Sequence, residues 1–213
     1  RNGQEFNASE IGIEVGVDQK TIQAWVGVLQ SSYLIYFLKP FHRNFNKTIT
    51  KRPKLYFYDA GLVCYLLGIT RTEQLINHPL RGAIFESFIV SELVKERLNR
   101  GLPINLYYWR EKNKYEIDVL IENFDAIIAL EIKSGQTIQS DYFKNIQYWL
   151  KLTKQKKGFV LYQGEQSQVR DNDKPYISLE NSDTRRFAQE DPRSFLAQFS
   201  KGAIFDEAQR VPE

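Results

Sequence analysis

The sequence predicts an α/β (α+β) protein with a small N-terminal part, built of two helices and two strands, and a larger part built around a sheet. Three observations support this prediction. Hydrophobic residues make up 42% and aromatic residues 14% of the 213 residues, a composition that suits a packed core. Apolar patterns with the periods of helices and of strands alternate between residues 81 and 162. The first forty residues contain a helix pair with clear start and stop signals.

A tight turn is expected between the two N-terminal helices. The first helix begins near Ala8 or Ser9 and ends at Gly16, and Asp18 caps the second helix. The second helix carries apolar residues at the i, i+3, i+4, i+7 spacing of a buried stripe. These residues are Ile22, Trp25, Val26 and Leu29.

Two strand patterns follow, at residues 33–41 and 54–59, and a basic segment lies between them. This segment, residues 39–54, contains six Lys or Arg and no acidic residue, although the net charge of the whole chain is only +3. Such a local excess of positive charge is typical of a surface that contacts nucleic acid. A solvated loop is the alternative.

The helix pair and the two strands together resemble a winged helix-turn-helix. In a DNA-binding version, the resemblance implies that the start of the second helix reaches base edges and that the basic segment contacts phosphates. The residues concerned are Gln19, Lys20, Thr21, Gln23, Lys47, Lys51 and Arg52. Winged helices also mediate protein contacts or act as spacers, so a protein partner stays open as an alternative.

The larger part is predicted to follow the order helix, three strands, helix, strand. After a helix from about Ala60 to Leu67 and a loop, we expect helices at residues 81–99 and 140–152. The strands are expected at residues 105–110, 115–122, 126–133 and 157–162. Short polar turns are expected at 112–114 and 123–125.

Charged side chains on two of these strands predict a polar site within an apolar sheet. Side chains alternate across a strand, so Glu116 and Asp118 share a face, opposite to Ile117, Val119 and Ile121. Glu131 and Lys133 likewise share a face of the next strand. If the two strands pair antiparallel, Asp118, Glu131 and Lys133 converge.

Buried charges of this kind need a partner, because an unpaired buried charge is costly. Two carboxylates suit Mg²⁺. The lysine could orient or deprotonate a water, or stabilise negative charge on a phosphate. The alternative is a structural salt bridge at the sheet edge. On the helix at 81–99, Glu86 shares an apolar stripe with Ile89, Val90 and Leu93, so we expect it to face inward towards a metal or another cation.

The Asp…Glu-x-Lys pattern and the element order resemble the PD-(D/E)xK nuclease superfamily. This resemblance implies a restriction-endonuclease-like αβββαβ core. It makes Asp118, Glu131 and Lys133 the catalytic residues and Glu86, Asp118 and Glu131 the Mg²⁺ ligands. Over residues 7–170, the chain also closely resembles the C-terminal region, of unknown function, of a family of bacterial and archaeal AAA-type ATPases. The family pattern has its acidic and basic residues at the same four positions.

The last stretch, residues 173–213, resembles the Walker B region of the same family's ATPase module. An apolar run ends in Asp206 and Glu207, which in a Walker B motif hold magnesium and orient the attacking water. No segment fits the Walker A pattern G-x-x-x-x-G-K-[ST], so this chain is not expected to hydrolyse ATP. ATP becomes a cofactor only if a Walker A module exists outside this chain.

These patterns predict four segments: a winged helix-turn-helix (1–58), a helical connector (59–80), a nuclease-like domain (81–172) and the Walker B-like fragment (173–213). We expect the C-terminal portion of an AAA-type ATPase family protein with a Mg²⁺-dependent nuclease-like site acting on nucleic acid phosphodiesters, DNA being favoured. The alternatives are a non-catalytic module that binds DNA or a protein, and a remnant fragment without independent function.

Other features of the composition indicate the cellular compartment of the protein and whether the chain is a fragment. The chain has no run of eighteen apolar residues, no signal-peptide pattern and a single cysteine, Cys64, so we expect a cytoplasmic protein that does not enter membranes. Self-association is left open, because ATPases of this family can assemble. The absence of Met, even at position 1, suggests a fragment or a processed chain.

Overall fold

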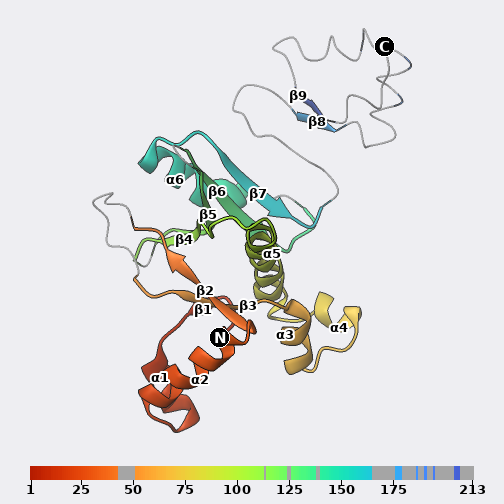
Figure 1. Cartoon of the computed structure of the whole chain (residues 1–213). Helices are drawn as coiled ribbons and strands as arrows, with labels where there is room; N and C mark the ends of the chain where they lie inside the picture. The colour runs from red at the N-terminus through yellow and green to blue at the C-terminus, as the bar shows by residue number, and fades with distance from the viewer. Residues whose placement is uncertain are drawn as a thin grey trace. The chain divides into compact units, whose positions relative to one another are not determined.

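The computed structural model describes residues 1–42, 51–112, 114–123, 126–137 and 140–164 (Figure 1). It also describes the short stretches 176–178 and 204–206 and the single positions 186, 190 and 194. The chain divides into two compact units, Arg1–Gln163 and Gly164–Glu213. Among the helices so described, none is long and apolar enough to cross a membrane.

Six α-helices are described in the first unit, and a 3-10 turn precedes the last of them. They are α1 (Ala8–Val15), α2 (Gln19–Ser31), α3 (Ala60–Leu66), α4 (Thr72–Ile76), α5 (Arg81–Asn99), the 3-10 turn η1 (Ser140–Phe143) and α6 (Lys144–Thr153). The strands of this unit are β1 (Gln4–Glu5), β2 (Ile35–Pro40), β3 (Lys54–Phe57), β4 (Leu106–Arg110), β5 (Glu116–Asn123), β6 (Ala126–Lys133) and β7 (Gly158–Tyr162). In the second unit, β8 (Tyr176–Ser178) and β9 (Ile204–Asp206) form a pair.

The seven strands of the first unit form one mixed sheet in the order β1-β3-β2-β4-β5-β6-β7. Strand β2 pairs parallel to β4, with Lys39 opposite Tyr107 and Pro40 opposite Tyr108. This pairing joins the N-terminal strands to the larger part, so one sheet runs across the segments predicted at 1–58 and 81–172. The segment boundaries themselves stay a prediction.

The helix ends near the N-terminus are those that the capping residues predict. Gly16 ends α1 in the left-handed conformation, with φ 79°. The Asp18 carboxylate accepts hydrogen bonds from the backbone N–H groups of Lys20 and Thr21 and so begins α2. Strands β2 and β3, predicted as a strand pair, do pair antiparallel.

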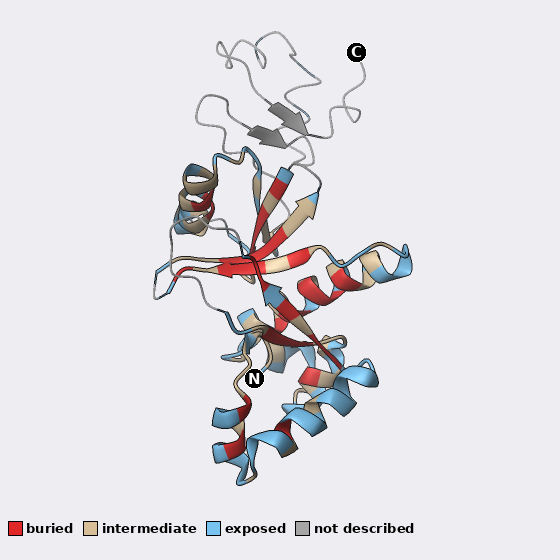
Figure 2. Ribbon diagram, turned by 60° about the vertical axis from the view of Figure 1, so that its left-hand side comes forward, coloured by how far each residue is buried: buried red, intermediate tan, exposed pale blue. Residues whose placement is uncertain are grey.

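The predicted buried stripe of α2 is largely wrong. Only Ile22 is buried, whereas 52% of Trp25 and 37% of Leu29 are exposed, and Val26 is half-buried. The reason is that α2 packs mainly against the short helix α1 and only weakly against β2, which together offer too little surface to cover a full stripe. Figure 2 shows α1 and α2 mainly in the colour of exposed residues.

In the larger part, every predicted helix and strand is present; α5 and β6 have the predicted ends, and the ends of the others differ by at most four residues. The largest difference is at α6, whose first predicted turn is the 3-10 turn η1. Strands β5 and β6 pair antiparallel, as the predicted site requires. The short elements β1 and α4 were not predicted. Of the two predicted turns, residues 113, 124 and 125 lie outside the described residues.

Two separate cores cover the two faces of this sheet. Figure 2 shows the central strands largely in the colour of buried residues. On one face, Val90 and Val94 of α5 pack with Leu130 and Ile132 of β6. On the other face, Ile146 and Trp149 of α6 pack with the following residues of the sheet: Trp109, Ile117, Leu120, Ile127 and Ala129. Strands β4–β6 therefore pack against α5 on one face and α6 on the other.

Candidate functional site

A bulge in β5 places Asp118. Tyr107 pairs with Leu120 and Trp109 pairs with Ile117, so Asp118 and Val119 together stand opposite the single residue Tyr108. The prediction that Ile117 and Val119 share a face is therefore wrong. Ile117 packs in the α6 core and Val119 in the α5 core, because the extra residue shifts the alternation by one.

The Asp118 carboxylate lies where β5 and β6 separate. The last paired residues before the separation are Val119 and Leu130. Beyond them, the backbone N–H of Ile132 donates to Oδ2 of Asp118 at 2.7 Å. The side chain thus replaces the backbone acceptor that a continuing strand would supply, and it satisfies a buried N–H group.

Glu131 and Lys133 of β6 complete the predicted group, which we call the Asp118 site (Asp118, Glu131 and Lys133). The Lys133 Nζ atom lies 2.9 Å from Oε2 of Glu131 and 3.7 Å from Oδ2 of Asp118. The other Glu131 oxygen, Oε1, accepts from the Asn145 amide of α6 at 2.9 Å. Glu131 is only 1% exposed, and each of its oxygens accepts a hydrogen bond within the protein.

The electrostatics of the Asp118 site follow from crowding two carboxylates in a buried place. Burial, and next the charge of Glu131, raise the pKa of Asp118 to about 7. Burial would lower the pKa of Lys133, but the charges of Asp118 and Glu131 outweigh it and raise that pKa above its usual value. Lys133 is therefore a cation at neutral pH, which favours charge stabilisation over proton abstraction as its role.

Glu86 faces inward, as predicted, and its cationic partner is the side chain of Lys54. The Lys54 ammonium of β3 lies 3.3 Å from Oε1 of Glu86 and also forms an ion pair with Glu116. The same Glu86 oxygen accepts a hydrogen bond from the Tyr56 hydroxyl. Burial, and next the charge of Asp118, raise the pKa of Glu86.

Three residues that contact the predicted site residues were not predicted: Lys54, Tyr56 and Asn145. Lys54 was assigned to the exposed basic segment, yet it is only 4% exposed. Strand alternation could have indicated the burial of Lys54. Lys54 and Tyr56 share one face of β3, and Tyr56 is fully buried. No comparable signal in the sequence singles out Asn145.

The residues predicted to contact bases lie at the start of α2 and are partly engaged in local hydrogen bonds. Gln19 accepts from the Ser9 hydroxyl at 2.9 Å, and Thr21 donates its hydroxyl to Asp18 at 2.7 Å. Lys20 and Gln23 are exposed on the same turns of the helix.

The predicted phosphate contacts are only partly described. Arg52 lies 3.4 Å from Glu10 in an exposed ion pair, and Lys51 is exposed. Lys47 lies outside the described residues.

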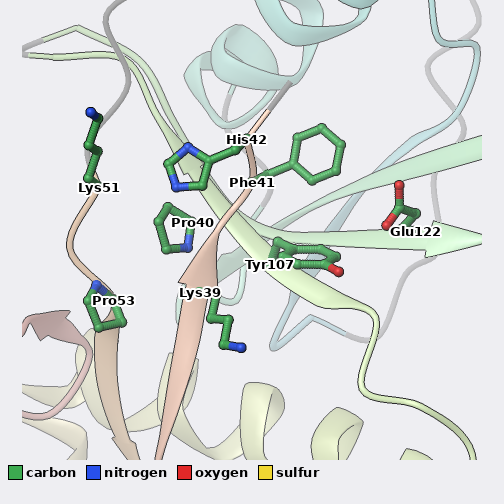
Figure 3. Close-up of a pocket in the computed structure, with 8 residues that line it drawn as sticks. All are labelled: Lys39, Pro40, Phe41, His42, Lys51, Pro53, Tyr107 and Glu122. Carbon is green, nitrogen blue, oxygen red and sulfur yellow. The ribbon is translucent and has the colours of Figure 1, made fainter. Parts of the chain in front are cut away.

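A basic pocket of about 470 Å³ lies where β2 pairs with β4 (Figure 3). Its basic residues are Lys39, His42 and Lys51, and Tyr107 supplies an aromatic ring. The remaining lining residues are Pro40, Phe41, Pro53 and Glu122. None of the three residues of the Asp118 site lines this pocket, so the chain presents two separate polar features.

The chemistry of the Asp118 site suits a hard divalent cation, although the group is small. Asp118 and Glu131 offer the oxygen ligands that Mg²⁺ prefers, and their mutual repulsion would fall if a cation lay between them. Among the residues that the structure describes, however, no three His, Cys, Asp or Glu side chains are grouped closely enough to hold a metal ion. Glu86 belongs instead to the Lys54 ion pair.

In the second unit, β8 and β9 run parallel, with Ser178 opposite Asp206. The strand β9 ends at Asp206, the residue predicted as Walker B-like. Glu207 lies outside the described residues. The strand of the predicted motif is therefore present, and the roles of both acidic residues stay a prediction.

Comparison with known proteins adds two domain matches. Residues 81–181 match the model of the domain of unknown function DUF4143, which is found in proteins associated with AAA-type ATPases. Residues 1–73 match the model of a second domain of unknown function, DUF8612.

Two mycobacterial proteins are similar to part of the chain. They are the uncharacterized proteins Rv2008c of Mycobacterium tuberculosis and Mb2031c of Mycobacterium bovis, each 31% identical over 136 residues. These residues make up 64% of the chain and span 30% of the length of either relative. No solved structure matches the chain.

Proposed function

We propose that the Asp118 site cleaves phosphodiester bonds in nucleic acid with the help of one or more Mg²⁺ ions. The observation that carries this proposal is the convergence of Asp118, Glu131 and Lys133 at the point where β5 and β6 separate. The order α5, β4, β5, β6, α6, β7 supports the proposal, because the core of a PD-(D/E)xK nuclease is expected to follow the same αβββαβ order.

In this function, Asp118 and Glu131 would hold the metal ion, and the ion would supply polarisation of the scissile phosphate or activation of a water molecule. Lys133 remains protonated and stabilises negative charge that develops on the phosphate. Asn145 holds the Glu131 carboxylate through its hydrogen bond to Oε1. The bulge at Asp118 keeps its carboxylate at the separation of the strands.

A plasmid-nicking assay with Mg²⁺ or Mn²⁺ tests this function. Asp118→Asn and Lys133→Met should each lower the nicking rate by about 100-fold or more, the usual effect of removing a group that acts on transition-state charge. The matched control is Glu73→Gln, an exposed acidic residue of α4, which should nick like the wild type. A wild-type protein that neither binds Mn²⁺ in calorimetry nor nicks DNA would rule out the proposal.

The second candidate function is nucleic-acid binding by a winged helix-turn-helix and the basic pocket. The specific observation is that Lys39, His42 and Lys51 surround a pocket that also contains Tyr107, which combines phosphate-binding charge with an aromatic ring for stacking. Lys20 and Gln23 at the start of α2 would extend the contact.

The salt dependence of binding tests this second function. Replacing both Lys39 and Lys51 with Ala should reduce the slope of log affinity against log salt by about 1.4 to 1.8, since each phosphate contact contributes about 0.7 to 0.9. Fluorescence anisotropy with labelled single-stranded and duplex DNA gives the slope. The control replaces Lys144 and Lys151, two exposed lysines of α6, and should leave the slope unchanged. Equal slopes for both double variants would exclude the pocket.

We place both functions in a longer protein of an AAA-type ATPase family. The DUF4143 match and the parallel pair β8–β9, which ends at Asp206, support this setting. ATP would bind only where a Walker A module is present in the intact protein. A DNA or protein partner and self-association belong to the same proposal.

A further inference from the structure

Lys54 is a buried charge whose influence reaches Asp118, since its charge acts to lower the pKa of that carboxyl, which burial raises. It is only 4% exposed, and its ammonium contacts two carboxylates, those of Glu86 and Glu116. The Nζ atom also lies 5.4 Å from the centre of the Tyr108 ring, an attractive arrangement for a cation. A charge buried this fully is stable only while its partners remain in place.

The Glu86 carboxylate is already bound to other side chains. Its Oε1 atom accepts from both Lys54 and Tyr56, and its side chain is only 20% exposed. Recruiting this carboxylate to a metal ion would break the ion pair and leave Lys54 with Glu116 as its only partner within the contacts described. Breaking a buried pair of this kind is strongly unfavourable.

We propose that Lys54 acts as a built-in cation that withdraws Glu86 and Glu116 from metal binding, so that the Asp118 site takes a single divalent cation. This inference rests on the proposed function and specifies its metal stoichiometry. It also replaces the expectation that Glu86 is a metal ligand. The N-terminal strand β3 thereby supplies a residue that shapes a site formed mainly by β5 and β6.

Calorimetric titration of the whole chain with Mn²⁺ tests the inference without any activity measurement. The wild type should bind one Mn²⁺, and Asp118→Asn should weaken this binding by about 100-fold or more. Glu86→Gln should bind one Mn²⁺ with an affinity within about twofold of the wild type, because outer groups that matter to a metal change its affinity by about 10-fold or more. Lys54→Gln should bind a second Mn²⁺, and Lys54→Gln combined with Glu86→Gln should bind one.

The outcomes separate this inference from the proposed function. A wild type that binds no Mn²⁺ overturns both. One Mn²⁺ in the wild type with a loss of 10-fold or more in Glu86→Gln overturns the inference and leaves the nuclease proposal intact. Two Mn²⁺ in the wild type overturn it as well. If Lys54→Gln does not fold, the Glu86→Gln titration decides, because that variant keeps the pair between Lys54 and Glu116.

Discussion

At the scale of single residues, the two carboxylates of the Asp118 site are buried, whereas the Lys133 side chain is 31% exposed. Glu131 is 1% exposed, yet each of its oxygens has a donor, one from Lys133 and one from Asn145. A buried carboxylate tolerates this position only while both donors remain. The stability of the sheet and the geometry of the site therefore depend on the same hydrogen bonds.

Asn145→Ala should lower the free energy of unfolding by about 1–3 kcal/mol, because it leaves a buried charged acceptor without its donor. Urea denaturation measures the change. Gln147→Ala is the matched control, since Gln147 is exposed on the same helix and its removal should change stability by less than about 0.5 kcal/mol. Equal effects of the two changes would show that the Asn145 hydrogen bond does not support Glu131.

The candidate site was predictable where it depends on strand alternation and not where it depends on irregular or distant structure. Glu131 and Lys133 share a face of β6 and form an ion pair, as alternation predicts. The bulge at Asp118 has no marker in the sequence, since neither Gly nor Pro stands there. Lys54 lies 32 positions before Glu86, and only the pairing of β2 with β4 and the packing of β3 on α5 bring them together.

At the scale of helices and strands, local signals account for most of the boundaries. Capping residues set the ends of α1 and α2, and long apolar patterns identified α5, β5 and β6. The two-residue strand β1 and the five-residue helix α4 are too short to show a period, so their formation depends on tertiary contacts. Trp25 shows a second limit of prediction from sequence. An apolar stripe indicates which face of a helix is apolar, but it does not show whether another element covers that face.

Two glycines of the helix pair should respond in opposite ways to the same substitution. Gly16→Ala should destabilise the protein by about 1 kcal/mol, because φ is 79° and a side chain there is strained. Gly27→Ala should stabilise it by about 0.5–1 kcal/mol, because Gly27 lies within α2 and Ala favours helices. An added Cβ would meet no atom within 4 Å at either position, so steric clashes do not contribute to the difference between the two substitutions. Thermal or urea unfolding gives both values, and changes of the same sign would contradict the assigned backbone conformations.

At the scale of the whole molecule, the parallel pairing of β2 with β4 makes one sheet of strands that come from two halves of the first unit. The α5 core crosses the same junction, since Tyr36 and Leu38 pack with Val90 and Val94. Shared strands and a shared core make the unfolding of the two halves mutually dependent.

Residues 1–163 should accordingly unfold in one transition. Pulse-labelling hydrogen exchange at increasing urea should give the same midpoint for peptides from β2 and β3 as for peptides from β5 and β6. Strands β5 and β6 belong to one antiparallel pair, so the difference between their two midpoints measures the experimental scatter. An earlier midpoint for β2 and β3 would show that the N-terminal strands form an independent unit.

The Lys54–Glu86 ion pair connects residues that lie in two different domain matches, 1–73 and 81–181. A recombination event that exchanged one of these segments for an unrelated one would leave a buried charge without its counterpart. We therefore expect the two segments to have been inherited together, with correlated substitutions across the junction. Relatives with an apolar residue at the position of Lys54 should also have lost the charges at the positions of Glu86 and Glu116.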